Sequence, residues 1–171
     1  MRFHLIDRIL ELDPGKRIRM VKNLTLGEEY LADHFPTFPV MPGVLMLQTL
    51  VEGAAWLLRA TEDFQHSVIA LREAKNVKYG NFMQPGNSMT VTVEAADYAP
   101  NEALAAFKGK AETAGHSTVS AKFTVARYNL RERNPALESV DERIVAEMRL
   151  HYRILCGELD PCEAAEPAAK G

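Results

Sequence analysis

The stretch that decides the fold of this chain reads His34-Phe35-Pro36-Thr37-Phe38-Pro39-Val40-Met41-Pro42-Gly43-Val44-Leu45. Each proline fixes its own φ and biases the preceding residue toward extended geometry, so this spacing predicts a stiff loop. Pro42 suits the start of a helix, where a missing N–H costs nothing. Gly43 leaves room for another group to approach helix-start N–H donors that have no acceptor within the helix. The stretch therefore predicts a histidine held beside a small oxyanion site.

An apolar helical pattern follows this loop directly. From Val44 to Arg59 the apolar residues lie around most of the helix circumference, which predicts a largely buried helix. His34 alone is weak evidence for function, because a lone histidine before a proline-rich turn is commonly an exposed residue. Asp33 could orient its imidazole, although neighbouring residues often point apart.

Strand patterns occur on both sides of this helix. Residues 17–24 and 89–94 alternate between apolar and polar side chains, and residues 103–112 and 117–127 are typical of a hairpin around Ala114-Gly115-His116. Shorter strand patterns at 67–71 and 77–79 flank a charged stretch, and residues 2–10 favour a short helix or turn. One long helix and several antiparallel strands indicate an α+β fold with the sheet wrapped around the helix.

A second helix is predicted near the C-terminus. Between residues 138 and 155 the apolar side chains recur every three or four residues and the other side is charged, so this helix is amphipathic. We expect a domain at 1–130, followed by a helical extension at 131–171 whose last residues, 163–171, form a frayed tail.

The composition is that of an ordinary globular protein. A chain of 171 residues fits one domain, and its net charge of -3 gives no reason to expect nucleic-acid binding. No metal-ligand spacing is present, and we expect no cofactor. We find no signal-peptide pattern and no membrane-spanning stretch, so we expect a cytoplasmic protein whose Cys156 and Cys162 are free thiols.

The stretch from His34 to Leu45 resembles the active-site loop of the 3-hydroxyacyl-acyl-carrier-protein dehydratases, the FabZ/FabA type of hotdog-fold enzyme. The match runs unbroken through His-Phe-Pro-x-x-Pro-Val-Met-Pro-Gly-Val-Leu. Weaker similarity covers residues 2–128 and includes Leu5–Leu10, the Pro14-Gly15-Lys16 turn and Phe82–Asn87. The resemblance implies a hotdog fold, a role in fatty-acid biosynthesis and an acyl carrier protein as partner. It also implies a homodimer with shared active sites, which could assemble further into a homohexamer.

The resemblance assigns roles in removing water from a 3-hydroxyacyl thioester. His34 takes the place of the base, and Gly43 takes the place of the glycine whose N–H binds the thioester oxygen. Phe82-Met83-Gln84-Pro85-Gly86 is similar to the second substrate-lining loop of the family. The predicted substrate-binding residues are Gly43, Phe38, Pro42, Val44, Phe82, Pro85 and Gly86.

The position of the catalytic acid departs from the family pattern. It falls on Gln48, which can orient a hydroxyl but cannot give up a proton. Loss of a positioned acid typically removes about 100- to 10,000-fold in rate. Glu52 lies one turn further on, about 6 Å away on the same helix face, where the family commonly has glutamine. Burial would raise its pKa and make it a better acid; alternatively, Glu52 caps or salt-bridges a neighbour.

Three functions fit these residues. The leading one is a 3-hydroxyacyl thioester dehydratase or hydratase. The second is a hotdog thioesterase, and the third is a silent acyl-binding or scaffold subunit, which Gln48 favours. An acidic carrier protein would need a basic docking patch, and the residues that could supply one are Arg72, Lys75, Lys78, Lys108, Lys110 and Arg127.

Overall fold

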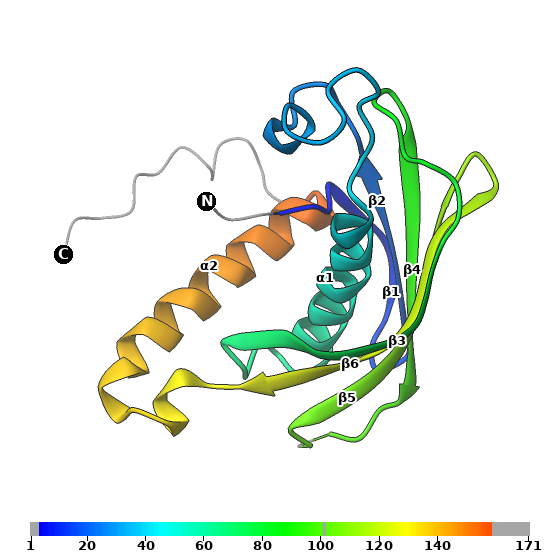
Figure 1. Cartoon of the computed structure of the whole chain (residues 1–171). Coiled ribbons are helices and arrows are strands. Elements are labelled where there is room, and N and C mark those ends of the chain that lie inside the picture. Colours follow the sequence, from blue (N-terminus) through cyan, green and yellow to red (C-terminus); the bar gives the residue numbers. More distant parts are fainter. Residues whose placement is uncertain (1–3, 101, 159–171) are drawn as a thin grey trace.

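One antiparallel sheet curls around one helix in the computed structural model, which describes residues 4–100 and 102–158 (Figure 1). The helix is α1 (Gly43–Thr61), and the sheet has the strand order β1-β2-β4-β5-β6-β3. This is the predicted α+β hotdog arrangement. The strands are β1 (Arg8–Asp13), β2 (Arg17–Asn23), β3 (Val68–Tyr79), β4 (Ser88–Asp97), β5 (Leu104–Thr113) and β6 (His116–Tyr128).

The concave face of the sheet holds α1. Leu50 and Ala54 are fully buried, and a Cβ atom added at Gly53 would collide with the Met20 side chain of β2. The absence of a side chain at Gly53 therefore lets the helix lie close to the sheet. The prediction of this buried helix is confirmed, as is that of the β5–β6 hairpin.

Two predictions about local structure were wrong. Residues 8–10 belong to strand β1 and not to a helix or turn, and a register shift between Ile9 and Glu11 interrupts the alternation that would have revealed the strand. The charged stretch after Leu71 lies within β3, which is one continuous strand. Its pairing with β6 shifts register twice, and Asn76 takes a φ of +53°, so the sequence pattern of this strand is irregular.

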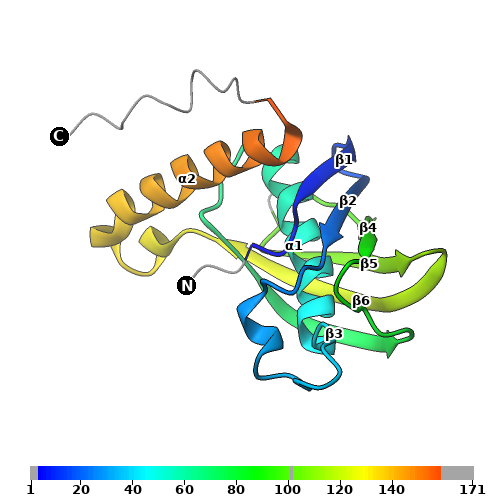
Figure 2. The same ribbon diagram turned by 90° about the horizontal axis from the view of Figure 1, so that it is seen from above.

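The predicted C-terminal helix is α2 (Glu138–Cys156), which lies on the side of α1 opposite the sheet (Figure 2). The Trp56 ring of α1 lies 6.3 Å from the Tyr152 ring of α2. The start of α2 is held by Asp141, whose carboxylate accepts hydrogen bonds from the Ser67 hydroxyl and from the N–H groups of Leu130 and Arg131. The extension is therefore packed against the hotdog core.

Three short 3-10 helices complete the described residues: Glu29–Leu31, Leu130–Glu132 and Pro135–Leu137. Cys162 and the predicted tail at 163–171 lie outside the described part of the chain. No helix within the described residues is both long and apolar enough to cross a membrane.

Candidate active site

The loop that carries His34 turns sharply at the next residue. Phe35 has a φ of +50°, which is unusual for a bulky side chain, and its carbonyl oxygen accepts the Phe38 N–H at 2.8 Å. The rings of His34 and Phe35 lie 4.5 Å apart. Such backbone conformations persist only where the surroundings enforce them, and they cluster at functional sites.

The two predicted site loops lie side by side. The Met41 N–H donates to the Met83 carbonyl oxygen at 2.9 Å, which joins the His34 loop to the connection between β3 and β4. The Phe38 and Phe82 rings meet edge to face at 5.7 Å. One backbone hydrogen bond and one aromatic contact therefore hold together segments that are distant in the sequence.

The first turn of α1 begins beside these loops. Pro42 is the N-cap residue, and its carbonyl oxygen accepts the N–H groups of Leu45 and Met46 at 2.9 and 3.1 Å. The Tyr79 ring covers Gly43 so closely that a Cβ atom added at Gly43 would lie 3.0 Å from Tyr79 Cε1. Glycine thus leaves space for an aromatic ring against the helix start.

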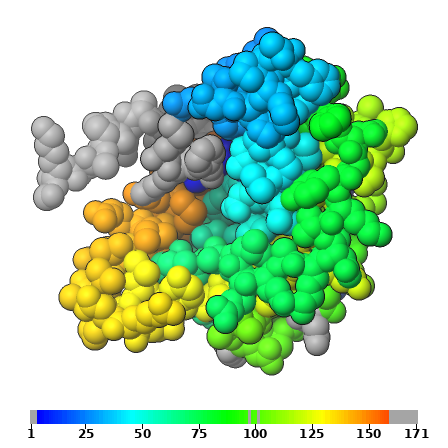
Figure 3. All heavy atoms as spheres, in the orientation of Figure 1, coloured from blue at the N-terminus to red at the C-terminus, as the bar shows by residue number. Residues whose placement is uncertain are grey.

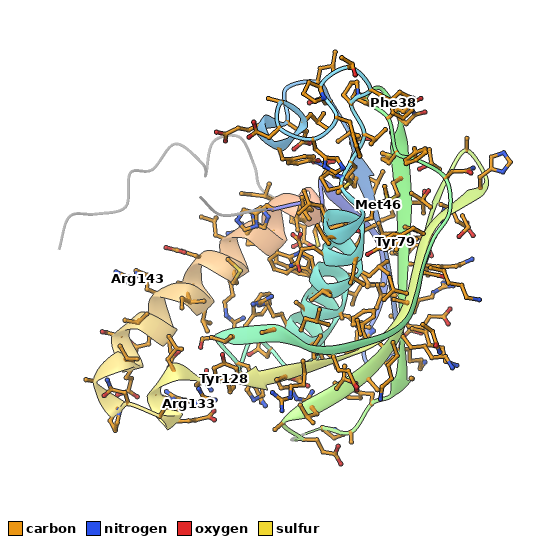
Figure 4. The ribbon with its side chains drawn as sticks, viewed as in Figure 1. Phe38, Met46, Tyr79, Tyr128, Arg133 and Arg143 are labelled. Carbon is orange, nitrogen blue, oxygen red and sulfur yellow. The ribbon has the colours of Figure 1, made fainter. Side chains whose placement is uncertain are left out.

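The His34 loop, the end of β3 with the connection that follows it, and the first turn of α1 enclose a cavity of about 250 Å³ at the N-terminal end of α1. Figure 4 labels Met46 and Tyr79 near this end of the helix and Phe38 on the loop beyond it. Three of the predicted site residues line the cavity together: His34, Gly43 and Phe82. Its other lining residues are Phe35, Val40, Met41, Met46, Tyr79, Gly80 and Asn81.

The remaining predicted binding residues lie around the cavity or away from it. Phe38 contacts Phe82 at its rim, and Pro42 caps the helix beside it. Val44 points outward and is 70% exposed. Pro85 and Gly86 are not among the lining residues; the Gly86 N–H donates to the Leu24 carbonyl oxygen at 2.8 Å, so this turn is anchored to the end of β2.

Gln48 and Glu52, the two residues predicted to act on the substrate hydroxyl, differ in their surroundings. Gln48 is exposed on α1, whereas Glu52 is buried beneath the N-terminal segment. Glu52 Oε2 accepts the Leu5 N–H at 2.9 Å, and Oε1 accepts the Trp56 indole N–H at 3.4 Å. Neither Gln48 nor Glu52 lines the His34 cavity of its own protomer.

Burial dominates the electrostatics of Glu52. It raises the pKa of the carboxyl above its ordinary value, although the hydrogen bonds from Leu5 and Trp56 and the charge of Arg59 act in the opposite direction. Arg59 lies over the Trp56 ring at 5.4 Å, and burial lowers its pKa to about 10. The carboxyl therefore has the elevated pKa expected of an acid, but it also anchors the N-terminal segment.

Sequence reasoning missed two side chains that shape the cavity, Tyr79 and Met46. Tyr79 pairs with Val119 of β6, which is fully buried, so the register of β3 directs the Tyr79 ring toward the helix. The sequence pattern predicted a strand as far as Tyr79 but not the face on which Tyr79 lies. The irregularity at Asn76 interrupts the alternation that would show which residues share a face.

The model of the FabA-like domain family matches residues 1–122 of the chain. The chain belongs to the FabA-like family. Among curated relatives, the 3-hydroxyacyl-[acyl-carrier-protein] dehydratase FabZ of Albidiferax ferrireducens is 37% identical over 128 residues, covering 72% of this chain and 83% of the relative. FabZ of Wolbachia pipientis wMel is 38% identical over 87 residues, covering 51% of this chain and 61% of the relative. The chain thus matches about three fifths of the length of this second relative.

Solved structures agree with the FabA-like fold. The dehydratase heterocomplex ApeI:P from Xenorhabdus doucetiae aligns with a TM-score of 0.62 over 79% of this chain and 90% of that chain. The E. coli PaaI protein aligns with a TM-score of 0.52 over 70% of this chain. Their sequence identities are 11% and 8%, so these likenesses concern the fold alone.

Proposed function

We propose that this protein is a cytoplasmic 3-hydroxyacyl-[acyl-carrier-protein] dehydratase, which converts a 3-hydroxyacyl thioester to a trans-2-enoyl thioester and water. The observation that carries the proposal is the cavity shared by His34, Gly43 and Phe82. Its lining is mainly apolar, which suits an acyl chain, and it joins an imidazole to the start of a long helix.

The first half of the reaction removes a proton from the carbon beside the thioester carbonyl. His34 accepts this proton as general base. The Gly43 N–H, at the positive end of the α1 dipole, donates to the carbonyl oxygen as negative charge develops there. Because these groups are fixed before the substrate binds, they can stabilise the enolate-like transition state without reorganising.

The second half expels the hydroxyl group, which must leave as water. Two groups can protonate the departing hydroxyl. The imidazolium formed at His34 can return its proton to it, or a protonated Glu52 can donate a proton. Gln48 orients the hydroxyl in either case, because its amide both donates and accepts hydrogen bonds. Glu52 can donate a proton to the substrate only if residues 4–6 move away from its carboxyl, which accepts the Leu5 N–H in this structure.

The proposal includes a homodimer in which the partner subunit supplies Gln48. Support comes from the outer side of α1, whose N-terminal half stays uncovered between α2 and β3 (Figure 3), with Val44 70% exposed and Gln48 exposed. Strand β3 is also an edge strand of 12 residues. A long unpaired edge is a template for pairing with another chain. A second copy placed on this side would bring its own Gln48 toward the cavity.

The test is hydration of a crotonyl thioester, followed by loss of enoyl absorbance, for wild type, His34→Ala, Gln48→Glu and Glu52→Gln. We expect an active wild type and a His34→Ala variant reduced by about 100-fold or more. Activity lost in a Glu52→Gln variant that is still folded at the assay temperature identifies Glu52 as the proton source, whereas activity retained assigns the return of the proton to His34.

Other outcomes would contradict the proposal. Release of free thiol without hydration would indicate a thioesterase. An inactive wild type that binds an acyl chain and gains hydration activity in Gln48→Glu would indicate a silent acyl-binding subunit.

A further inference from the structure

Five lysines gather on the convex face of the sheet, which points away from α1. We call this set the lysine face; it comprises Lys75 and Lys78 of β3, Lys108 and Lys110 of β5 and Lys122 of β6. All five are exposed. Figure 4 shows nitrogen-tipped side chains on this side of the sheet.

The strand register places three of these lysines in one row. Lys122 is the direct pairing partner of Lys108 on one side and of Lys75 on the other. A second row contains Lys110 and Lys78 on either side of Ser120. Like charges directly opposite one another on neighbouring strands are destabilising, so the fold itself does not require this arrangement.

Internal acids compensate the lysine face only in part. Lys75 pairs with Glu73 at 2.9 Å and Lys110 pairs with Glu112 at 3.1 Å. Within the described residues, Lys78, Lys108 and Lys122 form no ion pair, although Glu94 is the cross-strand neighbour of Lys108. An excess of positive charge therefore remains at the centre of the face of a protein whose net charge is -3.

One basic residue that the sequence suggested for this patch does not contribute to it. Arg127, which the sequence suggested as part of a basic patch, is buried and paired with Glu62, so it cannot contact a partner. The side chains that line the His34 cavity include no lysine or arginine. A negatively charged partner would therefore find cations on the convex face and not in the wall of the cavity.

The lysine face begins beside the cavity. Lys78 immediately precedes Tyr79, and Tyr79 and Gly80 line the cavity around His34. Neighbouring strands lie about 4.8 Å apart, so Lys108, two strands from β3, is within about 10 Å of it. The face is also hollowed between Asn76, Lys108 and Lys122. A bound protein that covers these strands would lie next to the end of β3.

We propose that the lysine face is the docking surface for the acidic acyl carrier protein, with the thioester-bearing arm passing over Gly80–Phe82 into the His34 cavity. This inference rests on the proposed function, because it names where the carrier of that substrate binds. Charge complementarity supplies the attraction, and the short path around the end of β3 connects docking to the cavity.

The test compares Lys108→Glu/Lys122→Glu with wild type on two substrates, crotonyl-acyl carrier protein and crotonyl-N-acetylcysteamine, which lacks the carrier. We expect the KM for the carrier-linked substrate to rise roughly tenfold or more while kcat/KM for the small thioester stays unchanged. Added salt should reduce the difference between variant and wild type, because it screens exposed charges. The matched control is Arg143→Glu, which reverses an exposed cation on α2 (Figure 4) and should change neither value.

Thermal unfolding provides a second readout. In the double variant the two glutamates again lie opposite each other, so Lys122→Glu alone serves as the folding control. This single change replaces the like-charge contacts with Lys75 and Lys108 by attractive ones and should be at least as stable as wild type, with the same direction of change in KM as the double variant. An equal loss of kcat/KM on both substrates, or an unchanged KM for the carrier-linked substrate, would overturn the docking proposal.

The design separates failure of docking from failure of the proposed function. If the wild type hydrates neither substrate, the dehydratase proposal fails, and docking is then measured by fluorescence anisotropy with labelled acyl carrier protein. Binding that is weakened in the double variant but not in Arg143→Glu supports the lysine face, and equal binding by all three proteins refutes it.

Discussion

The Met41 N–H and the Met83 carbonyl oxygen are joined by a hydrogen bond of 2.9 Å, and this bond connects the two halves of the candidate site. Met83 is fully buried and Met41 is nearly so. On one side of the bond lies the loop with His34, and on the other lies Phe82, which meets Phe38 at the rim. The site thus depends on a buried backbone contact that holds two otherwise exposed loops in register.

His34 is the residue on which the proposed chemistry depends most directly. We predict that His34→Ala lowers the rate of crotonyl thioester hydration by about 100- to 10,000-fold, because the general base is removed. Thermal stability should change little, since the ring is only partly buried. His116→Ala, at the exposed start of β6, is the control and should retain wild-type activity. Similar rates for His34→Ala and His116→Ala would rule out the base role.

The sequence was sufficient to predict the parts of the site that lie within continuous motifs. His34 and Gly43 belong to one proline-rich stretch that local pattern and resemblance together identified, and Phe82 belongs to a second short motif that the resemblance identified. Tyr79 and Met46 were missed because their place in the cavity depends on how the end of β3 packs against α1. That packing is a tertiary property that strand alternation does not encode.

The pair Gln48 and Glu52 shows the same limit within one helix. Helical spacing correctly places residues four apart on neighbouring parts of one face. However, the N-terminal segment covers Glu52 and leaves Gln48 exposed, so the two side chains have opposite environments. Helical periodicity predicts direction, but a distant segment of the chain decides burial.

Gly43 and Tyr79 should act as a coupled pair. Gly43→Ala places a Cβ atom 3.0 Å from the Tyr79 ring, and we expect the displaced ring to lower hydration activity roughly 10- to 100-fold. Stability should change by less than about 1 kcal/mol, because alanine favours the helix. If the loss acts through the ring, Tyr79→Ala should lower activity similarly, and the double variant should be no worse than either single one. Strictly additive losses would contradict this coupling.

Asp141 should control how firmly α2 is attached. Burial acts to raise the pKa of its carboxyl, but hydrogen bonds from Ser67, Arg131 and Leu130 outweigh that effect and keep the pKa below the ordinary value of 3.8. The stabilisation is therefore present above pH 3.8 and is lost as pH falls through the lower folded pKa. Asp141→Asn should unfold at a lower temperature than wild type at pH 7 and exchange α2 amides faster. Glu142→Gln, an exposed neighbour, is the control; equal exchange in the two variants would exclude the anchoring role.

Glu52 allows its structural role to be tested apart from catalysis. Glu52→Ala removes the acceptor for the buried Leu5 N–H, which should cost about 1–3 kcal/mol. For a chain of this size, each kcal/mol corresponds to a decrease in Tm of about 2–4 °C. Circular dichroism melts would measure this loss, and a melt identical to wild type would show that the carboxylate does not anchor the N-terminal segment.

The pH dependence of Glu52→Gln gives a sharper prediction. Because burial raises the folded-state pKa of Glu52 above 4.5, its favourable contribution to the free energy of unfolding is complete below pH 4.5 and declines as pH rises through the folded pKa. Glutamine mimics the neutral carboxyl and does not titrate, while all other groups titrate alike in both proteins. The free energy of unfolding of Glu52→Gln should therefore rise relative to wild type between about pH 4.5 and neutrality. A difference that stays constant with pH would mean that Glu52 titrates at its ordinary pKa, and the case for Glu52 as a proton donor near neutral pH would fail with it.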